Sequence, residues 1–151
     1  MRLTHDSRSA LARAKFFLEL ARTAPAVARV EFETFLEAAI VFARAAVHRF
    51  KATHEKHPAW KEWWNSISGN PAVEFFRTER DWKLKEAPPK IGQKVFAPFI
   101  GPGGTQEEGY MPATADEFYY FEDPGTPATT TVAEHLDALG TLLSDAERRF
   151  M

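Results

Sequence analysis

Prolines divide much of this sequence into segments whose apolar residues recur with the period of an α-helix. The breaks fall at Pro25, Pro58, Pro71 and the pair Pro88–Pro89. Proline lacks a backbone donor and disfavours the helical conformation in the residue before it, so each break begins or ends a helix. Each segment carries apolar residues three and four positions apart, which gather on one face that neighbours must cover. The sequence therefore predicts a helical bundle.

The successive segments predict helices of different character. Residues 7–23 form an ordinary amphipathic pattern, whereas residues 26–57 carry an apolar arc wide enough to place that helix at the centre of the bundle. A short Trp-rich helix is expected over 58–64. Asn70 and Pro71 then supply a capping side chain and a proline at the first position of a fourth helix.

The region 90–127 changes character. Apolar runs at 94–97 and 118–121 flank a Gly- and Pro-rich loop, a pattern typical of either a β-hairpin or an irregular arm. The sequence leaves both alternatives open. It predicts an arm that projects between the fourth helix and the last one.

The last segment predicts a helix that reaches nearly to the end of the sequence. Thr131 and Glu134 have the spacing of a capping box, and apolar residues follow at heptad spacing up to Phe150. No internal repeat or linker interrupts the chain, so we expect a single domain over 1–151. The predicted fold class is mainly α, a bundle of four to five helices with the arm before the last one.

The composition excludes several classes of protein. The chain has no cysteine, so it has neither disulfides nor thiolate metal sites, and it shows no signal peptide. No stretch approaches the roughly 20 apolar residues that cross a bilayer. We therefore expect a cytoplasmic protein with no membrane partner. The net charge of −2 requires any nucleic-acid binding to come from a local basic patch.

Arg80 is the most informative single residue. A helical projection places it among Val73, Phe76 and Leu84 on the apolar side of the fourth helix. A charge on such a face needs a partner, because an unpaired buried charge costs several kcal/mol. Glu37 on the polar stripe of the central helix is the carboxylate in reach. The sequence therefore predicts a Glu37–Arg80 ion pair.

Two interpretations of this pair stay open. In the first, the ion pair fixes the register of the two helices and has no ligand. In the second, a polar pocket between the helices presents Arg44, His48 and Arg80 to an anion. The sequence favours the first.

Three segments together resemble the helical scaffold of HEPN-like bacterial proteins. They are residues 35–44, 60–64 and 71–81. The resemblance implies a helical bundle, often dimeric, in a family with many RNases and components of toxin systems. The family's site combines an Arg, an adjacent polar residue and a His a few positions later. Here Arg80 and Asp81 match the first two positions, and Lys85 stands where the His is expected.

Lys85 at the position of the expected histidine favours binding over catalysis. A side chain with a pKa of about 10.4 does not shuttle protons near pH 7 as a histidine does. We therefore expect a non-catalytic or weakly catalytic interaction module, with no cofactor. The alternative is an RNA- or nucleotide-binding protein, or a metal-independent ribonuclease of a toxin-type system, that uses Arg80 and Arg44. In that case Arg44, His48, Arg80, Asp81 and Lys85 contact the phosphates.

Two further patterns concern partners. Trp82 and Phe75 lie away from the predicted apolar side, where they stack on a base, form a second core face or form a seam between two copies of the chain. The sequence favours the core face or the seam over base stacking, and a homodimer is expected. The histidines at 54 and 57 lack the spacing of a helical zinc motif, so no metal is expected.

Overall fold

The computed structural model describes residues 6–24, 28–84, 90–93, 99–100, 106–107 and 118–150, with backbone alone for 82–84, 99–100 and 106–107. Most of these residues are helical. The helices are α1 (Ser7–Thr23), α2 (Arg29–His54), α3 (Trp60–Ser66), α4 (Pro71–Leu84) and α5 (Ala128–Arg149). The predicted class, a mainly α bundle with an arm before the last helix, is confirmed, and the structure shows that the arm contains β-strands.

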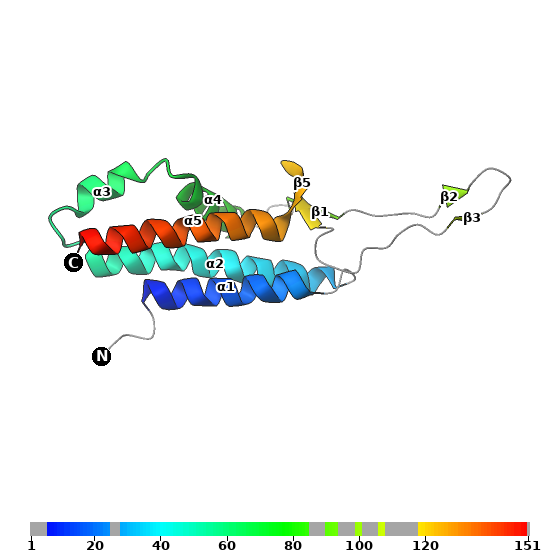
Figure 1. Ribbon diagram of the computed structural model, residues 1–151, viewed down its shortest axis with the longest axis horizontal. Helices are drawn as coiled ribbons and strands as arrows, with labels where there is room; N and C mark the ends of the chain where they lie inside the picture. The colour runs from blue at the N-terminus through cyan, green and yellow to red at the C-terminus, as the bar shows by residue number, and fades with distance from the viewer. Residues whose placement is uncertain are drawn as a thin grey trace.

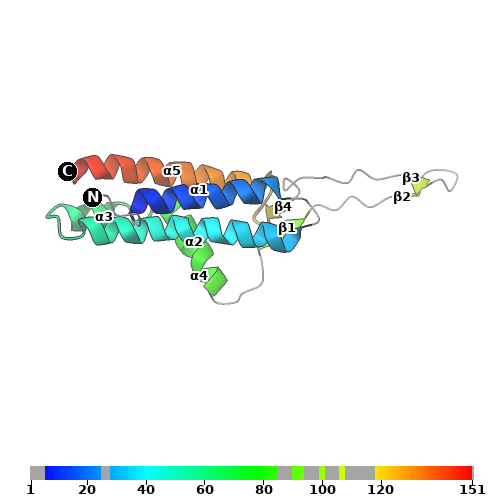
Figure 2. The same ribbon diagram turned by 90° about the horizontal axis from the view of Figure 1, so that it is seen from below.

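The helix α2 lies at the centre of the bundle. It packs against α1, α4 and α5. Figure 2 shows α1 along one side of α2 and α4 on the other. The buried positions of α2 cover the wide apolar arc predicted from the sequence, and they are Phe32, Leu36, Ala39, Ile40, Ala43, Ala46, Val47 and Phe50. Every other element that matters for the site is positioned against this helix.

Side-chain caps fix the starts of α1 and α4. The Oδ1 atom of Asp6 accepts a hydrogen bond of 2.8 Å from the backbone N–H of Ser9. In the same way Asn70 Oδ1 accepts from the N–H groups of Ala72 at 3.0 Å and Val73 at 3.4 Å. These groups have no partner within the helix, so the cap satisfies them. The cap predicted at Asn70 is confirmed.

The last helix begins earlier than the sequence predicted. Its first residue is Ala128, and its N-terminal flank is Pro127, which makes no side-chain cap. The predicted capping box at Thr131 and Glu134 is therefore wrong, because both residues lie inside the helix. The strand β5 ends at Pro127 and α5 follows directly, so the start is set by the end of the strand.

A small antiparallel sheet precedes α5. It contains β1 (Ile91–Gln93), β4 (Phe118–Tyr120) and β5 (Asp123–Pro127) in the order β1-β4-β5. A separate antiparallel pair joins β2 (Phe99–Ile100) to β3 (Gln106–Glu107). The pairings β1–β4 and β2–β3 are nested, which is the pattern of a hairpin. The predicted apolar run at 94–97 and the Gly-rich loop lie outside the described residues.

Aromatic contacts attach the sheet and the short helix to the bundle. The ring of Phe118 on β4 stacks on Phe32 of α2, with the centroids 4.2 Å apart. At the opposite end of α2, Phe50 packs against Trp63 of α3 and Phe150 after α5. Figure 1 shows the sheet and α3 at the two ends of the long helices. Both ends of the bundle are thus closed by aromatic side chains.

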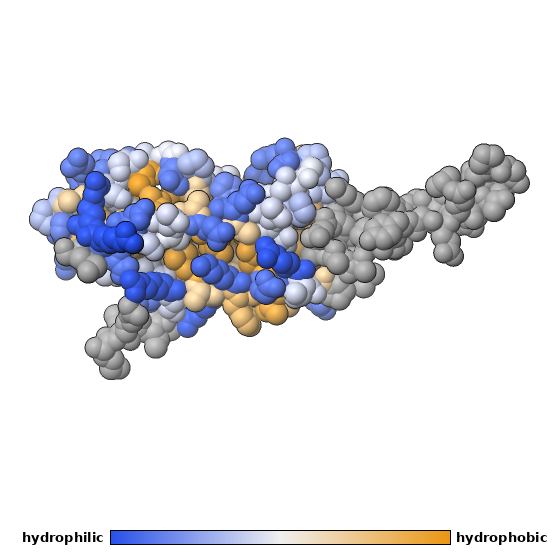
Figure 3. Space-filling view, in the orientation of Figure 1, coloured by the Kyte–Doolittle hydropathy of each residue, from blue (hydrophilic) through white to orange (hydrophobic). Residues whose placement is uncertain are grey.

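The outer surface is mixed in polarity. Figure 3 shows polar side chains over α1 and α5, with apolar ones visible along the line between these helices. Phe16 of α1 is 60 % exposed. Among the described helices, none has the length and apolar character that a membrane span requires.

Candidate functional site

The helix α4 carries polar groups on two sides, one facing α2 and one facing α5. Its inward positions are Ala72, Val73, Phe76 and Glu79, all less than a tenth exposed. Val73 and Phe76 were predicted there. The charged residue among them is Glu79, with 7 % of its surface exposed, and not Arg80. The helix is thus turned by about one residue from the predicted orientation.

Arg80 therefore lies at the edge of the buried face. Its side chain is 38 % exposed, and its Nη1 atom lies 4.0 Å from Asp81 Oδ1. Glu37 is exposed. Among the described residues no ion pair joins Glu37 to Arg80, so the predicted pair is not formed. At the edge of the face water solvates the guanidinium, which removes the need for a carboxylate on α2.

Arg80 belongs instead to a group of basic side chains between α2 and α4. We call this group the basic face, and it consists of Arg44, His48 and Lys51 on α2 with Arg77 and Arg80 on α4. The structure thus brings together Arg44, His48, Arg80 and Asp81 of the predicted anion site. Lys85 lies outside the described residues.

Arg44 is a half-buried cation of the basic face. Burial lowers the pKa of its guanidinium, Asp81 opposes that effect, and the positive charges of Arg77 and Arg80 add to it. Its Nε atom is buried and makes no hydrogen bond within the described part of the chain. A buried donor without a partner costs about 1–3 kcal/mol, so an acceptor that reached Arg44 would be bound favourably.

A small cavity opens beside Arg44. Its volume is about 90 Å³, and its lining includes Arg44, Arg77, Trp64 and Ser68. Lys51 completes the surroundings, since its Nζ atom lies 5.4 Å from the centroid of the Trp64 ring. Cations from two helices thus lie beside one aromatic ring, a combination also found in proteins that bind single-stranded nucleic acids.

His48 is held neutral by its surroundings. Burial lowers its pKa, and the positive charges of Arg44, Arg80 and Lys51 lower it further. A bound anion would cancel part of this repulsion and raise the pKa again. His48 is therefore the group on the basic face whose protonation reports an anion.

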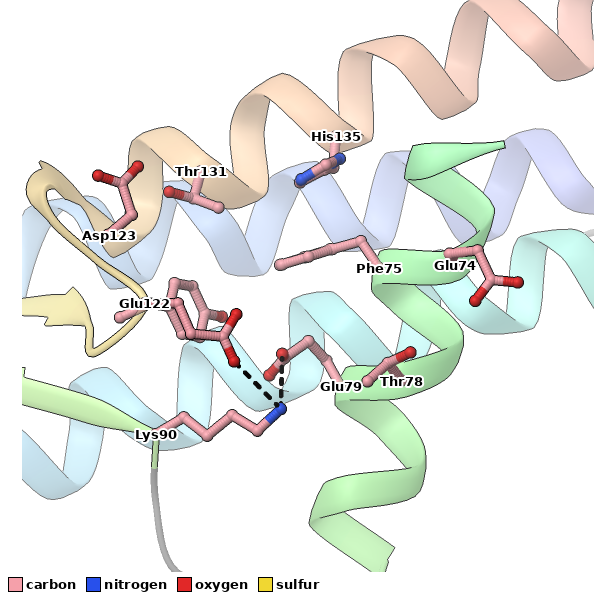
Figure 4. Close-up of a pocket in the computed structure, with 10 residues that line it drawn as sticks. Glu74, Phe75, Thr78, Glu79, Lys90, Glu122, Asp123, Thr131 and His135 are labelled. Carbon is pink, nitrogen blue, oxygen red and sulfur yellow. Dashed lines mark ion pairs between the residues drawn. The ribbon is translucent and has the colours of Figure 1, made fainter. Parts of the chain in front are cut away.

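The opposite side of α4 borders a larger cavity of about 340 Å³. Figure 4 shows side chains that line it, which come from α4, α5 and the sheet. We call it the acidic cavity because its lining contains four carboxylates. The acidic members are Glu74, Glu79, Glu122 and Asp123.

The lining of the acidic cavity includes a part-buried lysine between two carboxylates and a tyrosine with a buried hydroxyl. Lys90 Nζ is 3.8 Å from Glu79 Oε1 and 4.0 Å from Glu122 Oε1 (Figure 4). Tyr120 is 6 % exposed, and its hydroxyl oxygen is buried without a hydrogen-bond partner in the described part of the chain. Burial, and secondarily the charge of Glu79, raises the pKa of Tyr120, so this phenol stays protonated.

An aromatic stack forms one wall of the acidic cavity. The ring of His135 on α5 lies parallel to Phe75 on α4, with centroids 4.2 Å apart and planes 13° apart. Burial lowers the pKa of His135 despite the nearby charge of Glu134. The imidazole is therefore neutral near pH 7, and Lys90 is the cation of this cavity.

Sequence reasoning predicted members of the basic face and missed the acidic cavity. Arg44 and His48 are four positions apart on one helix, so spacing alone places them together. Glu79, Lys90, Tyr120 and His135 come from different elements, and no local spacing unites them. The available signal is the run of acidic residues after position 105.

A search for metal ligands and three comparisons with known proteins complete the description of the site. Within the described residues, no group of three or more acidic or histidine side chains has the arrangement of a metal site. No family model, curated protein or solved structure matches the chain.

Proposed function

We propose that this protein is a non-catalytic binding module whose basic face holds the phosphates of single-stranded RNA. The observation that carries the proposal is the excess of positive charge between α2 and α4. Arg44, Lys51, Arg77 and Arg80 lie around one site, and the acidic groups acting on Arg44 there are Asp81 and Glu74. Like charges held together in this way repel one another, and an anion relieves that repulsion.

The partners of the two carboxylates strengthen this argument. Glu74 is engaged by Arg77, whose Nη2 atom lies 2.7 Å and 2.6 Å from its two oxygens. Asp81 lies at 4.0 Å from Arg80, which is a weak contact at an exposed site. The charges of Arg44 and Lys51 therefore remain largely uncompensated within the face, and phosphates are the polyanionic groups that guanidinium forks bind best.

Trp64 favours RNA over a free phosphate ion. Its ring lies beside Arg44 in the small cavity and beside Lys51. An aromatic ring next to cations adds base stacking to phosphate contacts, and unpaired bases are free to stack. The resemblance to HEPN-like proteins stays a prediction and agrees with this choice of ligand.

The experiment measures binding of a short fluorescent oligouridine by anisotropy at several salt concentrations. With about three phosphate contacts, we expect the logarithm of the association constant to fall with the logarithm of salt with a slope of about −2. The double variant Arg44→Gln with Arg80→Gln should bind about tenfold more weakly or worse, with a slope nearer to zero.

A matched control places the same charge change on α1. Lys15→Gln with Arg22→Gln removes two exposed cations from the far side of α2 (Figure 2). This variant should bind RNA nearly as the unmodified chain does. Equal losses in the two double variants, or no salt-dependent binding at all, would contradict the proposal.

The ribonuclease alternative has its own test. His48 lies on the basic face with a lowered pKa, so it is the group there that could accept a proton near pH 7. We expect the oligouridine to remain intact during prolonged incubation. Cleavage that disappears in His48→Gln would establish catalysis and refute the non-catalytic part of the proposal.

The homodimer and the cytoplasmic location also stay predictions. Phe16 and Phe121 are each 60 % exposed, and large exposed aromatic side chains favour association. Light scattering after gel filtration measures the mass directly. A monomer at all concentrations would remove the homodimer from the account.

A further inference from the structure

The acidic cavity has features that the RNA proposal does not use. It lies on the side of α4 that faces α5, and its volume of about 340 Å³ exceeds that of the cavity beside Arg44. A cluster of carboxylates alone is common on protein surfaces. A second, independent feature of this cavity favours a ligand.

That feature is the hydroxyl group of Tyr120. The residue lines the cavity, is 6 % exposed, and its oxygen makes no hydrogen bond with the described part of the chain. Burying a hydroxyl without a partner costs free energy, and native proteins rarely do so without cause. A ligand group that enters the cavity and bonds this oxygen recovers the cost.

The charge of the lining decides the sign of the ligand. Four carboxylates surround the cavity, while Lys90 is its cation and His135 is held neutral by burial. Lys90 itself illustrates the preference, since its ammonium group lies within 4.0 Å of both Glu79 and Glu122. The lining therefore attracts cations and repels anions.

The arrangement of the carboxylates decides the shape of the ligand. In Figure 4, Asp123 at the start of β5 and Glu74 on α4 lie toward opposite ends of the cavity, with Phe75 and His135 between them. The stacked rings of these two residues give the middle of the cavity an apolar wall. A molecule with positive groups at its ends and methylene groups between them matches this pattern.

We propose that the acidic cavity binds an aliphatic diamine or polyamine. Its ammonium groups bond Asp123 at one end and Glu74, which they share with Arg77, at the other. One of them also reaches the Tyr120 hydroxyl, and the methylene chain lies along Phe75 and His135. A divalent metal ion fits this lining less well, because the carboxylates are spread over the length of the cavity and no metal-like group of ligands occurs among the described residues. This proposal does not depend on RNA binding at the basic face.

Tyr120→Phe is the decisive variant. It removes one oxygen and keeps the ring, so it deletes the proposed ligand contact without emptying the core. Because that oxygen is unpartnered in the free protein, the melting temperature should stay the same or rise. The affinity for spermidine, measured by calorimetry at moderate salt, should fall about fivefold or more. A role in folding alone predicts the reverse, a lower melting temperature with unchanged spermidine binding.

Two further experiments test whether binding depends on the charge of the ligand and on the position of the carboxylates. Asp123→Asn should weaken spermidine binding, whereas Asp137→Asn, a carboxylate of α5 outside the cavity lining, should leave it unchanged. An aliphatic diol of similar length should not bind. The proposal is supported by saturable spermidine binding that both cavity variants weaken. It is overturned if spermidine does not saturate, if the diol binds equally, or if Asp123→Asn and Asp137→Asn have equal effects.

Discussion

On the side of α4 that faces α2, cations gather around Arg44, whereas the side that faces α5 carries carboxylates around a cavity. The two regions are joined by the ion pair between Glu74, which lines the acidic cavity, and Arg77 of the basic face. A net charge of −2 for the chain conceals this separation. The lesson is that nearly balanced charge in a small domain is compatible with two sites that select ligands of opposite sign.

One buried residue holds both sides of α4 in place, and its truncation should cause the largest loss of stability. Phe76 is fully buried on α4 between them. Phe76→Ala leaves a large cavity, so the free energy of unfolding should fall by about 3–5 kcal/mol. Urea unfolding measures this loss. The exposed Phe16→Ala is the matched control and should change the value by less than about 0.5 kcal/mol; equal effects would contradict the described core.

The acidic side should respond to the loss of its buried carboxylate. Glu79→Ala removes the group that lies 3.8 Å from Lys90 and opens a hole in the lining of the cavity. We expect the free energy of unfolding to fall by about 1–3 kcal/mol. Glu122→Ala removes a carboxylate whose side chain is 83 % exposed, so it should cost far less. An equal loss of unfolding free energy in Glu122→Ala would show that the burial of Glu79 does not make its ion pair more important for stability than that of Glu122.

Acid should weaken the fold through the histidines whose pKa the folded chain lowers. Burial lowers the pKa of His135 below the ordinary value of 6.5, so between these two values the unfolded chain binds more protons than the folded one. The free energy of unfolding is therefore highest above about pH 6.5, and it falls as the pH drops below that value. His48 and His54 act in the same direction.

Thermal unfolding across this pH range tests the effect. His135→Gln should flatten the dependence, because the substituted side chain does not titrate. An identical pH dependence in this variant would show that His135 is as solvated in the folded chain as in the unfolded one.

The basic side should show the smallest effect on stability. Arg80 is 38 % exposed and lies 4.0 Å from Asp81, so Arg80→Ala should change the free energy of unfolding by less than about 0.5 kcal/mol. RNA binding should still weaken in the same variant. A large loss of stability would instead favour the interpretation that Arg80 serves the fold, as the sequence first indicated.

The contrast between the two regions also marks what the sequence could predict. The helices, the central place of α2 and the cap at Asn70 follow from local spacing, and the structure confirms them. The basic residues of α2 were found for the same reason. Local spacing could not predict the rotation of α4 about its own axis. Glu79 and Arg80 lie at the two edges of one apolar stripe, and only packing decides which of them is buried.

The acidic cavity shows why the rest could not be predicted. Lys90 and Tyr120 meet Glu79 because β1 and β4 pair in one particular register, with Ile91 opposite Tyr120. That register brings together residues far apart in the sequence, and no periodic pattern encodes it. The unpartnered hydroxyl of Tyr120 is visible only once the fold is known.

One measurement tests the two-sided account most directly, an amide NMR titration of the labelled chain with oligouridine and, separately, with spermidine. We predict that RNA shifts resonances around Arg44 and Arg80 and raises the pKa of His48, while spermidine shifts those around Tyr120 and His135. Overlapping sets of shifted resonances, or RNA shifts confined to the acidic cavity, would contradict the assignment of opposite ligands to the two sides of α4.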